Sequence, residues 1–222
     1  MRYYWHSMQR TPEPELMDEQ EQAAAYARED WSESHGKIPR YFRERFPQFK
    51  GGRVVDLGCG TADVTVRFAR AFPEVKVVGV DGSDAMLGFG RRAVHEAALE
   101  ARITLENRYL PDAELESRKF DAVICNSLLH HFADPVELWR TAARCGKPGA
   151  PVLLIDLLRP ANHEAALQFV DKYTKDAPPI LKRDFTASLH AAYTADEVRE
   201  QLKAAGLPSF KVDEVDEIYF AG

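Results

Sequence analysis

Val54-Val55-Asp56-Leu57-Gly58-Cys59-Gly60 and, further along the chain, Val77-Val78-Gly79-Val80-Asp81 are the two stretches that decide the fold. The first is typical of a strand that ends in a glycine turn, and the second of a strand that ends in a carboxylate. Glycines let the backbone turn tightly and approach a ligand, and a helix after the turn points its free N–H groups at the same place. A carboxylate at the second strand end can accept hydrogen bonds from both hydroxyls of a ribose. The two stretches therefore predict a cradle for a nucleotide-type cofactor.

The glycine turn differs from the dinucleotide-binding fingerprint at two positions. Asp63 follows Gly58 and Gly60 where the fingerprint has a third glycine or alanine, and a carboxylate there would repel a phosphate. Asp56 lies at the strand end, where dinucleotide-binding strands are normally apolar. An anion at this point suits a ligand that carries an ammonium and a sulfonium. We therefore expect a cofactor that is positively charged near the turn, and a nicotinamide-dependent oxidoreductase is the less favoured alternative.

These motifs, with Phe120–Phe132 and Lys147–Asp156 further on, resemble the class I S-adenosylmethionine-dependent methyltransferase family, and in particular its ubiquinone/menaquinone-type branch. The resemblance extends from about Arg53 to Arg159. One departure is Ala150, where family members often have a second glycine after the proline. The resemblance implies S-adenosylmethionine as the cofactor and methyl transfer to a small-molecule acceptor as the reaction. The second hypothesis is a protein that binds this cofactor without methylating, in a cyclase-like or sensing role.

The expected fold is α/β, because strand and helix alternate from Arg53 onward. With the resemblance, this alternation predicts a Rossmann-like, seven-stranded, mostly parallel sheet with helices on both faces and a C-terminal antiparallel hairpin. Two helices, at 164–175 and 185–192, are expected after the last parallel strand, separated by Pro178-Pro179. The chain is expected to divide into residues 1–50, a helical N-terminal lid; residues 51–159, the cofactor-binding core; residues 160–193, an inserted helical cap; and residues 194–222, a helix and strand pair that complete the core.

Most residues expected at the cofactor lie at the carboxyl edge of the sheet, where open α/β folds bind ligands. The strand-end acid Asp81 would hold the ribose, and the glycine turn would contact the amino-acid end. Core packing is an equal alternative for Met86, lid packing for Tyr26, and a surface turn for Glu106 and Asn107. The full set of predicted cofactor contacts is Asp56, Gly58, Gly60, Asp81, Gly82, Met86, Glu106, Asn107, Asn126 and Tyr26.

The acceptor is expected near the connection that follows the fourth strand. His130 and His131 lie there, and a neutral imidazole can accept a proton near physiological pH, so either is a candidate general base. The alternative is that the pair is a scaffold feature bonded to the backbone. Transfer from a sulfonium needs little acid–base help, because it depends mainly on holding the reacting atoms in line. Shape-giving residues of the cap are therefore candidate substrate contacts: Arg159, Tyr173 and Tyr193.

Composition limits the remaining function classes. A net charge of −6 argues against nucleic acid as a partner, because polyanion binding relies on lysine and arginine. No apolar run is long enough to span a bilayer, and the N-terminus lacks a signal-peptide pattern, which favours a cytoplasmic protein. The three cysteines are expected to be reduced thiols. The spacing of the seven histidines predicts no metal site, and the oligomeric state stays open.

Overall fold

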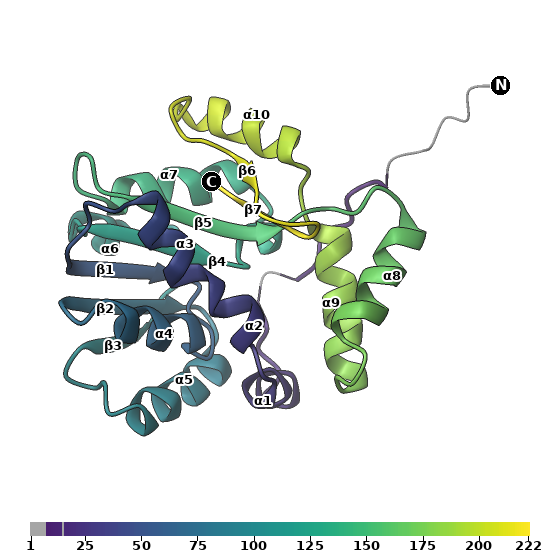
Figure 1. Cartoon of the computed structure of the whole chain (residues 1–222), viewed down its shortest axis with the longest axis horizontal. Helices are drawn as coiled ribbons and strands as arrows, with labels where there is room; N and C mark the ends of the chain where they lie inside the picture. Colours follow the sequence, from purple (N-terminus) through teal and green to yellow (C-terminus); the bar gives the residue numbers. More distant parts are fainter. Residues whose placement is uncertain (1–7, 15) are drawn as a thin grey trace.

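The computed structural model describes residues 8–14 and 16–222 (Figure 1). The strands of this part of the chain are β1 (Gly52–Leu57), β2 (Val75–Asp81), β3 (Ile103–Asn107), β4 (Ala122–Asn126), β5 (Val152–Leu157), β6 (Asp213–Glu214) and β7 (Tyr219–Ala221). They form one sheet in the order β3-β2-β1-β4-β5-β7-β6. Strands β1 to β5 run parallel, and β7 is antiparallel to both β5 and β6. The predicted mostly parallel sheet with its C-terminal antiparallel hairpin is confirmed.

Helices cover both faces of this sheet, as predicted. They are α1 (Gln20–Arg28), α2 (Ser32–His35), α3 (Lys37–Arg45), α4 (Asp63–Ala71), α5 (Asp84–Glu96), α6 (Ala113–Ser117), α7 (Pro135–Cys145), α8 (His163–Tyr173), α9 (Pro179–Ala191) and α10 (Ala195–Ala205), with a 3₁₀ turn at Leu129–His131. One core lies between the sheet and α3, α4 and α5, and a second lies between the sheet and α6, α7 and α10. In Figure 1, α8 and α9 stand beyond the ends of β4 and β5, which leaves the carboxyl edge of the sheet facing them.

Local signals explain where these elements begin. Val54 and Val55 are consecutive in β1, and each packs into the core on a different face of the sheet, as a strand buried on both faces requires. Asp134 caps α7 by accepting a hydrogen bond from the Val136 N–H at 3.0 Å, with Pro135 in the first turn. Thr194 begins α10 through a capping box, as the sequence indicates. Together these features fix the core that positions the strand ends.

The segment before β1 is partly a component of the core. Phe42 of α3 is fully buried, and its ring packs edge to face on Phe68 of α4 at a centroid distance of 5.0 Å. Phe49 and Phe72 also contact it edge to face, at 5.2 and 5.6 Å. Helix α3 therefore packs as part of the core on one face of the sheet, although the sequence assigns it to the N-terminal lid of residues 1–50.

The first described residues form no helix, although the sequence predicted a helical segment there. Pro12 and Pro14 explain the difference, because proline disfavours helical geometry in the residue before it. The Met8 N–H donates to the Ala161 carbonyl at 3.2 Å, and the Thr11 N–H donates to the His190 carbonyl at 2.9 Å. Helix begins only at Gln20. We call residues 8–14 and 16–18 the strap, since they cross the carboxyl edge of the sheet from the cap to α5.

The cap contains two helices, as predicted, but α9 begins earlier than expected. Pro179 is its first residue, and the helix continues to Ala191. Proline suits the first helical turn because its missing N–H has no partner there and its φ is already helical. The Pro178-Pro179 pair, which was expected to separate two helices, therefore forms the start of the second one.

Two further observations concern the whole described chain. None of its helices combines the length and the hydropathy needed to cross a bilayer. Cys59, Cys125 and Cys145 are all free and buried, which agrees with the expectation of reduced thiols.

Candidate active site

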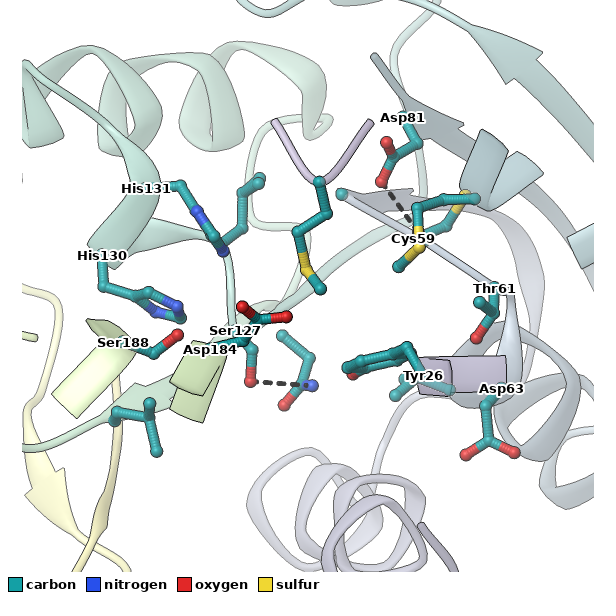
Figure 2. A pocket seen from close by; sticks show the side chains of 18 of the residues that line it. Tyr26, Cys59, Thr61, Asp63, Asp81, Ser127, His130, His131, Asp184 and Ser188 are labelled. Atoms are coloured by element: carbon teal, nitrogen blue, oxygen red, sulfur yellow. Dashed lines mark hydrogen bonds between the residues drawn. The ribbon is translucent and has the colours of Figure 1, made fainter. Parts of the chain in front are cut away.

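A cavity of about 920 Å³ opens at the carboxyl edge of the sheet, between the strap, α1, α2 and α9. Its volume is at the upper end of the range of about 300–1,000 Å³ that is usual for small-molecule sites. Figure 2 shows two groups of side chains in it. The cofactor half surrounds Asp81, Cys59 and Asp63, and the acceptor half surrounds His130 and Ser188. The space is sufficient for a nucleoside and a second small molecule.

The glycine turn forms the floor of the cofactor half. Gly58 has a φ of +72°, and a Cβ built on it would lie 2.8 Å from the side chain of Leu128. Gly60 has a φ of +51°, and its N–H donates a 2.9 Å hydrogen bond to Oδ2 of Asp81. Both glycines are therefore required by the turn itself, and their backbone lines the cavity.

Asp81 is held in place by backbone groups on both of its oxygens. Gly60 bonds Oδ2, and the Ser83 N–H donates to Oδ1 at 2.8 Å. Each oxygen keeps a further lone pair for a ligand hydroxyl. Burial raises the pKa of this carboxyl despite the two backbone hydrogen bonds, which lower it. The geometry suits a group that accepts two hydrogen bonds from neighbouring hydroxyls.

Asp56 is the second acid of the cofactor half and is only 1% exposed. It accepts a 2.6 Å hydrogen bond from Oγ1 of Thr65. Burial raises its pKa to about 7, the hydrogen bond from Thr65 opposes this shift, and the nearby charge of Asp81 adds to it. A buried carboxyl of this kind is stabilised in its charged form by an adjacent cation.

An aromatic row encloses the cofactor half on the side of α1 and α2. The rings of Tyr26 and Trp31 lie 4.6 Å apart, and Trp31 stacks on His35 at 5.2 Å. Nδ1 of His35 lies 2.8 Å from Oδ2 of Asp63, the first residue of α4. Tyr26 was predicted at the cofactor and does line the cavity. His35 was not predicted, because nothing near it in the sequence indicates that α2 packs beside the glycine turn.

Other predicted cofactor contacts divide into two groups. Met86 and Asn126 line the cavity, as does Gly82. Glu106 and Asn107 do not line it. Glu106 is instead held by two arginines, Arg108 at 2.6 Å and Arg118 at 2.7 Å, and the Asn107 side chain donates to the Gly82 carbonyl at 3.3 Å. The cavity is lined instead by the four residues that follow, Arg108, Tyr109, Leu110 and Pro111.

The predicted substrate residues also divide. Tyr173 lines the acceptor half. Arg159 does not, because its guanidinium pairs with Glu197 at 2.6 Å. Tyr193 lies outside as well: its hydroxyl donates to the Phe132 carbonyl at 3.3 Å, and the Arg10 guanidinium lies over its ring at 4.2 Å. These two side chains therefore contact residues next to the cavity and do not line it.

His130 is the most enclosed group of the acceptor half, with a side chain 3% exposed. Its Nδ1 is hydrogen-bonded to Oδ1 of Asp156, at the end of β5. Burial lowers the pKa of this imidazole, but the charge and hydrogen bond of Asp156 and the charge of Glu13 outweigh burial and raise it overall. The carboxylate thereby fixes the orientation of the ring, so that Nε2 faces the strap.

His131 has a different environment. Its Nδ1 lies 3.0 Å from the carbonyl of Pro14, and a carbonyl only accepts, so Nδ1 carries the hydrogen. Burial and the neighbouring charge of His130 lower its pKa to about 4. His131 is therefore neutral at physiological pH, with a lone pair on Nε2.

Glu13 enters this half from the strap and was not predicted. Its Oε2 accepts a 3.3 Å hydrogen bond from Ser188 of α9, and its Oε1 lies 3.2 Å from Nε2 of His130. Asp184, also on α9, lines the same region and accepts a 2.9 Å hydrogen bond from Gln22. Burial raises the pKa of Glu13, and the charges of Asp156 and Asp184 add to the shift. Sequence spacing contains no signal for these contacts, since they join segments more than 100 residues apart.

The cavity as a whole is acidic. Its lysine and arginine, Lys37 and Arg108, both pair with carboxylates: Lys37 lies 3.3 Å from Asp216, and Arg108 lies 2.6 Å from Glu106. Neither cation is therefore available to balance a pyrophosphate. This charge distribution disfavours a nicotinamide dinucleotide and favours a cationic ligand.

Comparison with known proteins agrees with this geometry. A family model described as a methyltransferase domain matches residues 54–149. The 27-O-demethylrifamycin SV methyltransferase of Amycolatopsis mediterranei is 27% identical over 77% of this chain and 59% of its own length. The demethylmenaquinone methyltransferase of Listeria welshimeri is 31% identical over 63% of this chain and 58% of its own length. The chain thus spans less than two thirds of these relatives.

A solved structure shows the shared fold. The crystal structure of a SAM dependent methyltransferase from Aquifex aeolicus gives a TM-score of 0.67 at 18% identity, covering 90% of this chain and 95% of that one. The domain match begins in β1 and includes the glycine turn and Asp81. Residues 54–149 therefore match a methyltransferase domain, and the described chain shares the fold of a SAM dependent methyltransferase.

Proposed function

We propose that this protein transfers the methyl group of S-adenosylmethionine to a small-molecule acceptor. The observation that carries the proposal is Asp81, whose two oxygens are fixed by the backbone beside the glycine turn. A ribose hydroxyl pair is the ligand group that matches two aligned acceptors. The acidic lining supports a cofactor that carries an ammonium and a sulfonium.

The residues of the cofactor half have distinct roles in this proposal. Asp81 accepts hydrogen bonds from the ribose, and Asp56 stabilises the ammonium across the glycine turn. Tyr26 and Met86 contact the adenosine, with Gly82 and Asn126 beside them on the cavity wall. Bound S-adenosylmethionine supplies an activated methyl group on a sulfur that leaves without charge.

Positioning accounts for most of the rate enhancement. Holding a nucleophile and a methyl carbon in line converts a bimolecular reaction into a unimolecular one, which contributes up to about 7–11 kcal/mol in favourable cases. The strap and α9 supply this constraint, because they wall the acceptor half from the side opposite the sheet. His130 and His131 line the same half of the cavity, next to the place proposed for the acceptor.

The acceptor is a small molecule, and the proposed site of action is the cytoplasm. The relatives named above are, by their names, methyltransferases of 27-O-demethylrifamycin SV and of demethylmenaquinone. Buried free thiols are compatible with a reducing compartment. Tyr173 and Phe185 on the cap contribute aromatic surface to the acceptor half, which suits an acceptor with apolar area.

Isothermal titration calorimetry with S-adenosylhomocysteine tests the proposal. Asp81→Asn is expected to weaken binding at least tenfold, because one amide end replaces an acceptor by a donor. Asp196→Asn on α10, whose side chain is 92% exposed, removes the same charge away from the cavity and is the control. Equal affinity in wild type and Asp81→Asn would contradict the cofactor assignment. Formation of S-adenosylhomocysteine during incubation with S-adenosylmethionine and candidate acceptors separates a methyltransferase from a cyclase-like or sensing protein.

A further inference from the structure

We propose that Glu13, His130 and His131 bind a divalent transition-metal ion in the acceptor half of the cavity. One potential ligand atom from each residue lies within 4.8 Å of the others. Two histidines and one carboxylate are a ligand set that Zn²⁺ and Fe²⁺ use in catalytic sites with open positions. The sequence spacing predicted no metal site, because the carboxylate comes from the strap, 117 residues before His130.

The first observation is an unsatisfied oxygen. Oε1 of Glu13 is buried and accepts no hydrogen bond within the described chain, although the side chain is only 8% exposed. Oε1 lies 3.2 Å from Nε2 of His130. With ligand distances of about 2.1 Å, this separation corresponds to an angle of about 100° at a shared metal ion, which suits tetrahedral or octahedral coordination.

The second observation is that the remaining polar atom of each ligand already has a partner. Nδ1 of His130 bonds Asp156, Nδ1 of His131 donates to the Pro14 carbonyl, and Oε2 of Glu13 accepts from Ser188. Metal-binding histidines almost always donate their other N–H to a carboxylate or carbonyl, which fixes the tautomer and directs the free lone pair. Nε2 of His130 and Oε1 of Glu13 therefore face each other, and the ring of His131 lies beside them, with its Nδ1 3.5 Å from the same oxygen.

The charges around the cluster favour a cation. Asp156 and Glu13 flank His130, and Asp184 lies near Glu13. Arg10 forms no ion pair with these carboxylates among the described residues; its guanidinium donates to the carbonyls of His130 and Ala191 at 2.9 and 2.6 Å. A divalent ion would compensate these carboxylates and attach the strap to the turn after β4.

A metal ion at this place has a consequence for the acceptor, which rests on the proposed function. Three protein ligands leave coordination positions open to the cavity, and an oxygen of the acceptor would occupy one. The substrate class would then be molecules with a ligating hydroxyl or phenol. Nε2 of a histidine that binds the ion does not serve as a general base.

The test uses the full chain freed of metal with EDTA and titrated with ZnCl₂ by calorimetry, with CoCl₂ as a spectroscopic probe. Wild type is expected to bind one ion per chain. Glu13→Gln and His131→Ala are each expected to weaken Zn²⁺ binding at least tenfold and to remove the visible absorption of the Co²⁺ complex. His163→Ala is the matched control, because His163 and His190 form another close histidine pair, 3.2 Å apart on the cap.

Two results would overturn the proposal. One is wild-type Zn²⁺ affinity no higher than that of Glu13→Gln and His131→Ala; a proton shared between Glu13 and His130 would then satisfy the carboxylate. The other is binding that only His163→Ala removes. Circular dichroism and S-adenosylhomocysteine titrations of each variant establish that the fold and the cofactor half are intact. Failure of S-adenosylhomocysteine to bind wild type would contradict the proposed function without changing the Zn²⁺ result.

Discussion

The backbone N–H of Gly60 donates a 2.9 Å hydrogen bond to Oδ2 of Asp81. This contact joins the turn after β1 to the end of β2. The strands are in register, with Asp56 opposite Gly79 and Leu57 opposite Val80, so the turn and the acid emerge at the same edge. The hydrogen bond therefore makes the turn and the ribose-binding acid one unit, and a disturbance of either is expected to change cofactor binding.

Gly58→Ala tests this coupling. The substitution places a side chain at a φ of +72° and 2.8 Å from Leu128, so we expect it to destabilise the fold by about 1–3 kcal/mol and to weaken cofactor binding. Thermal denaturation and calorimetry with S-adenosylhomocysteine measure the two effects. Gly88→Ala in α5 is the control, because nothing lies within 4 Å of its Cβ position; it should leave binding unchanged and stabilise the helix by about 0.5–1 kcal/mol. Similar behaviour of both variants would show that the turn has no special requirement for glycine.

The raised pKa of Asp56, about 7, makes cofactor binding depend on pH. A nearby ammonium favours the carboxylate, so affinity should rise by up to about tenfold between pH 6 and pH 8 as the proton is released. In the protein without cofactor, the same raised pKa makes the free energy of unfolding change with pH in the opposite direction. The folded-state pKa exceeds the unfolded one, so stability falls as pH rises from about 4 to about 7.

Asp56→Asn removes both effects while keeping the size of the side chain. Its affinity for S-adenosylhomocysteine should be lower than that of wild type at pH 8 and nearly constant between pH 6 and pH 8. Calorimetry in buffers of different ionisation enthalpy counts the released proton directly. No proton release in wild type would contradict the placement of the cofactor ammonium beside Asp56.

Much of the fold was predictable because its signals are local. The apolar runs of β1 to β5 and the caps at Ser83, Asp134 and Thr194 each indicate an element within a few residues of its observed bounds. The bounds of the final hairpin were predicted less accurately: the sequence suggests strands at 209–215 and 217–220, and the observed strands are shorter. Strand β6 contains only Asp213 and Glu214, because an edge strand is defined by its partner more than by its own sequence.

The cofactor half and the acceptor half of the cavity also differed in how far local sequence predicted the residues that line them. Asp56 and Asp81 were predictable, since parallel strands bring their carboxyl ends to one edge. Glu13 and Ser188 were not, because the strap and α9 reach the cavity through tertiary packing alone. Glu106 was assigned to the cofactor from its place after a strand, but two arginines hold it elsewhere. Local position therefore predicted the cofactor half better than the acceptor half.

The stability of a Phe42 variant tests whether α3 is part of the hydrophobic core. If α3 is part of the core, Phe42→Ala should destabilise the whole domain by about 3–5 kcal/mol, because a fully buried ring that packs on Phe68 is replaced by a cavity. Urea denaturation followed by circular dichroism measures the free energy of unfolding. A loss below about 1 kcal/mol with an intact sheet would instead support a separable segment before β1.

Arg10 is the residue that attaches the strap to the acceptor half. Its guanidinium bonds the carbonyls of Ala191 and His130 and lies over the ring of Tyr193. Lysine keeps the charge but lacks the planar fork that reaches two carbonyls while stacking on a ring. Arg10→Lys is therefore expected to loosen the strap almost as much as Arg10→Ala, with little change in the unfolding temperature of the core.

Two measurements distinguish this loosening from general destabilisation. Limited proteolysis should cleave both variants faster within the strap, and stopped-flow displacement should show faster S-adenosylhomocysteine release, since Met17 of the strap accepts a hydrogen bond from Ser83 beside Asp81. Arg199→Ala, at a pair on the outer side of α10 with Asp196, serves as the control. Unchanged release and cleavage rates in Arg10→Ala would mean that the strap is held by its backbone contacts to the cap, and that Arg10 does not control access to the cavity.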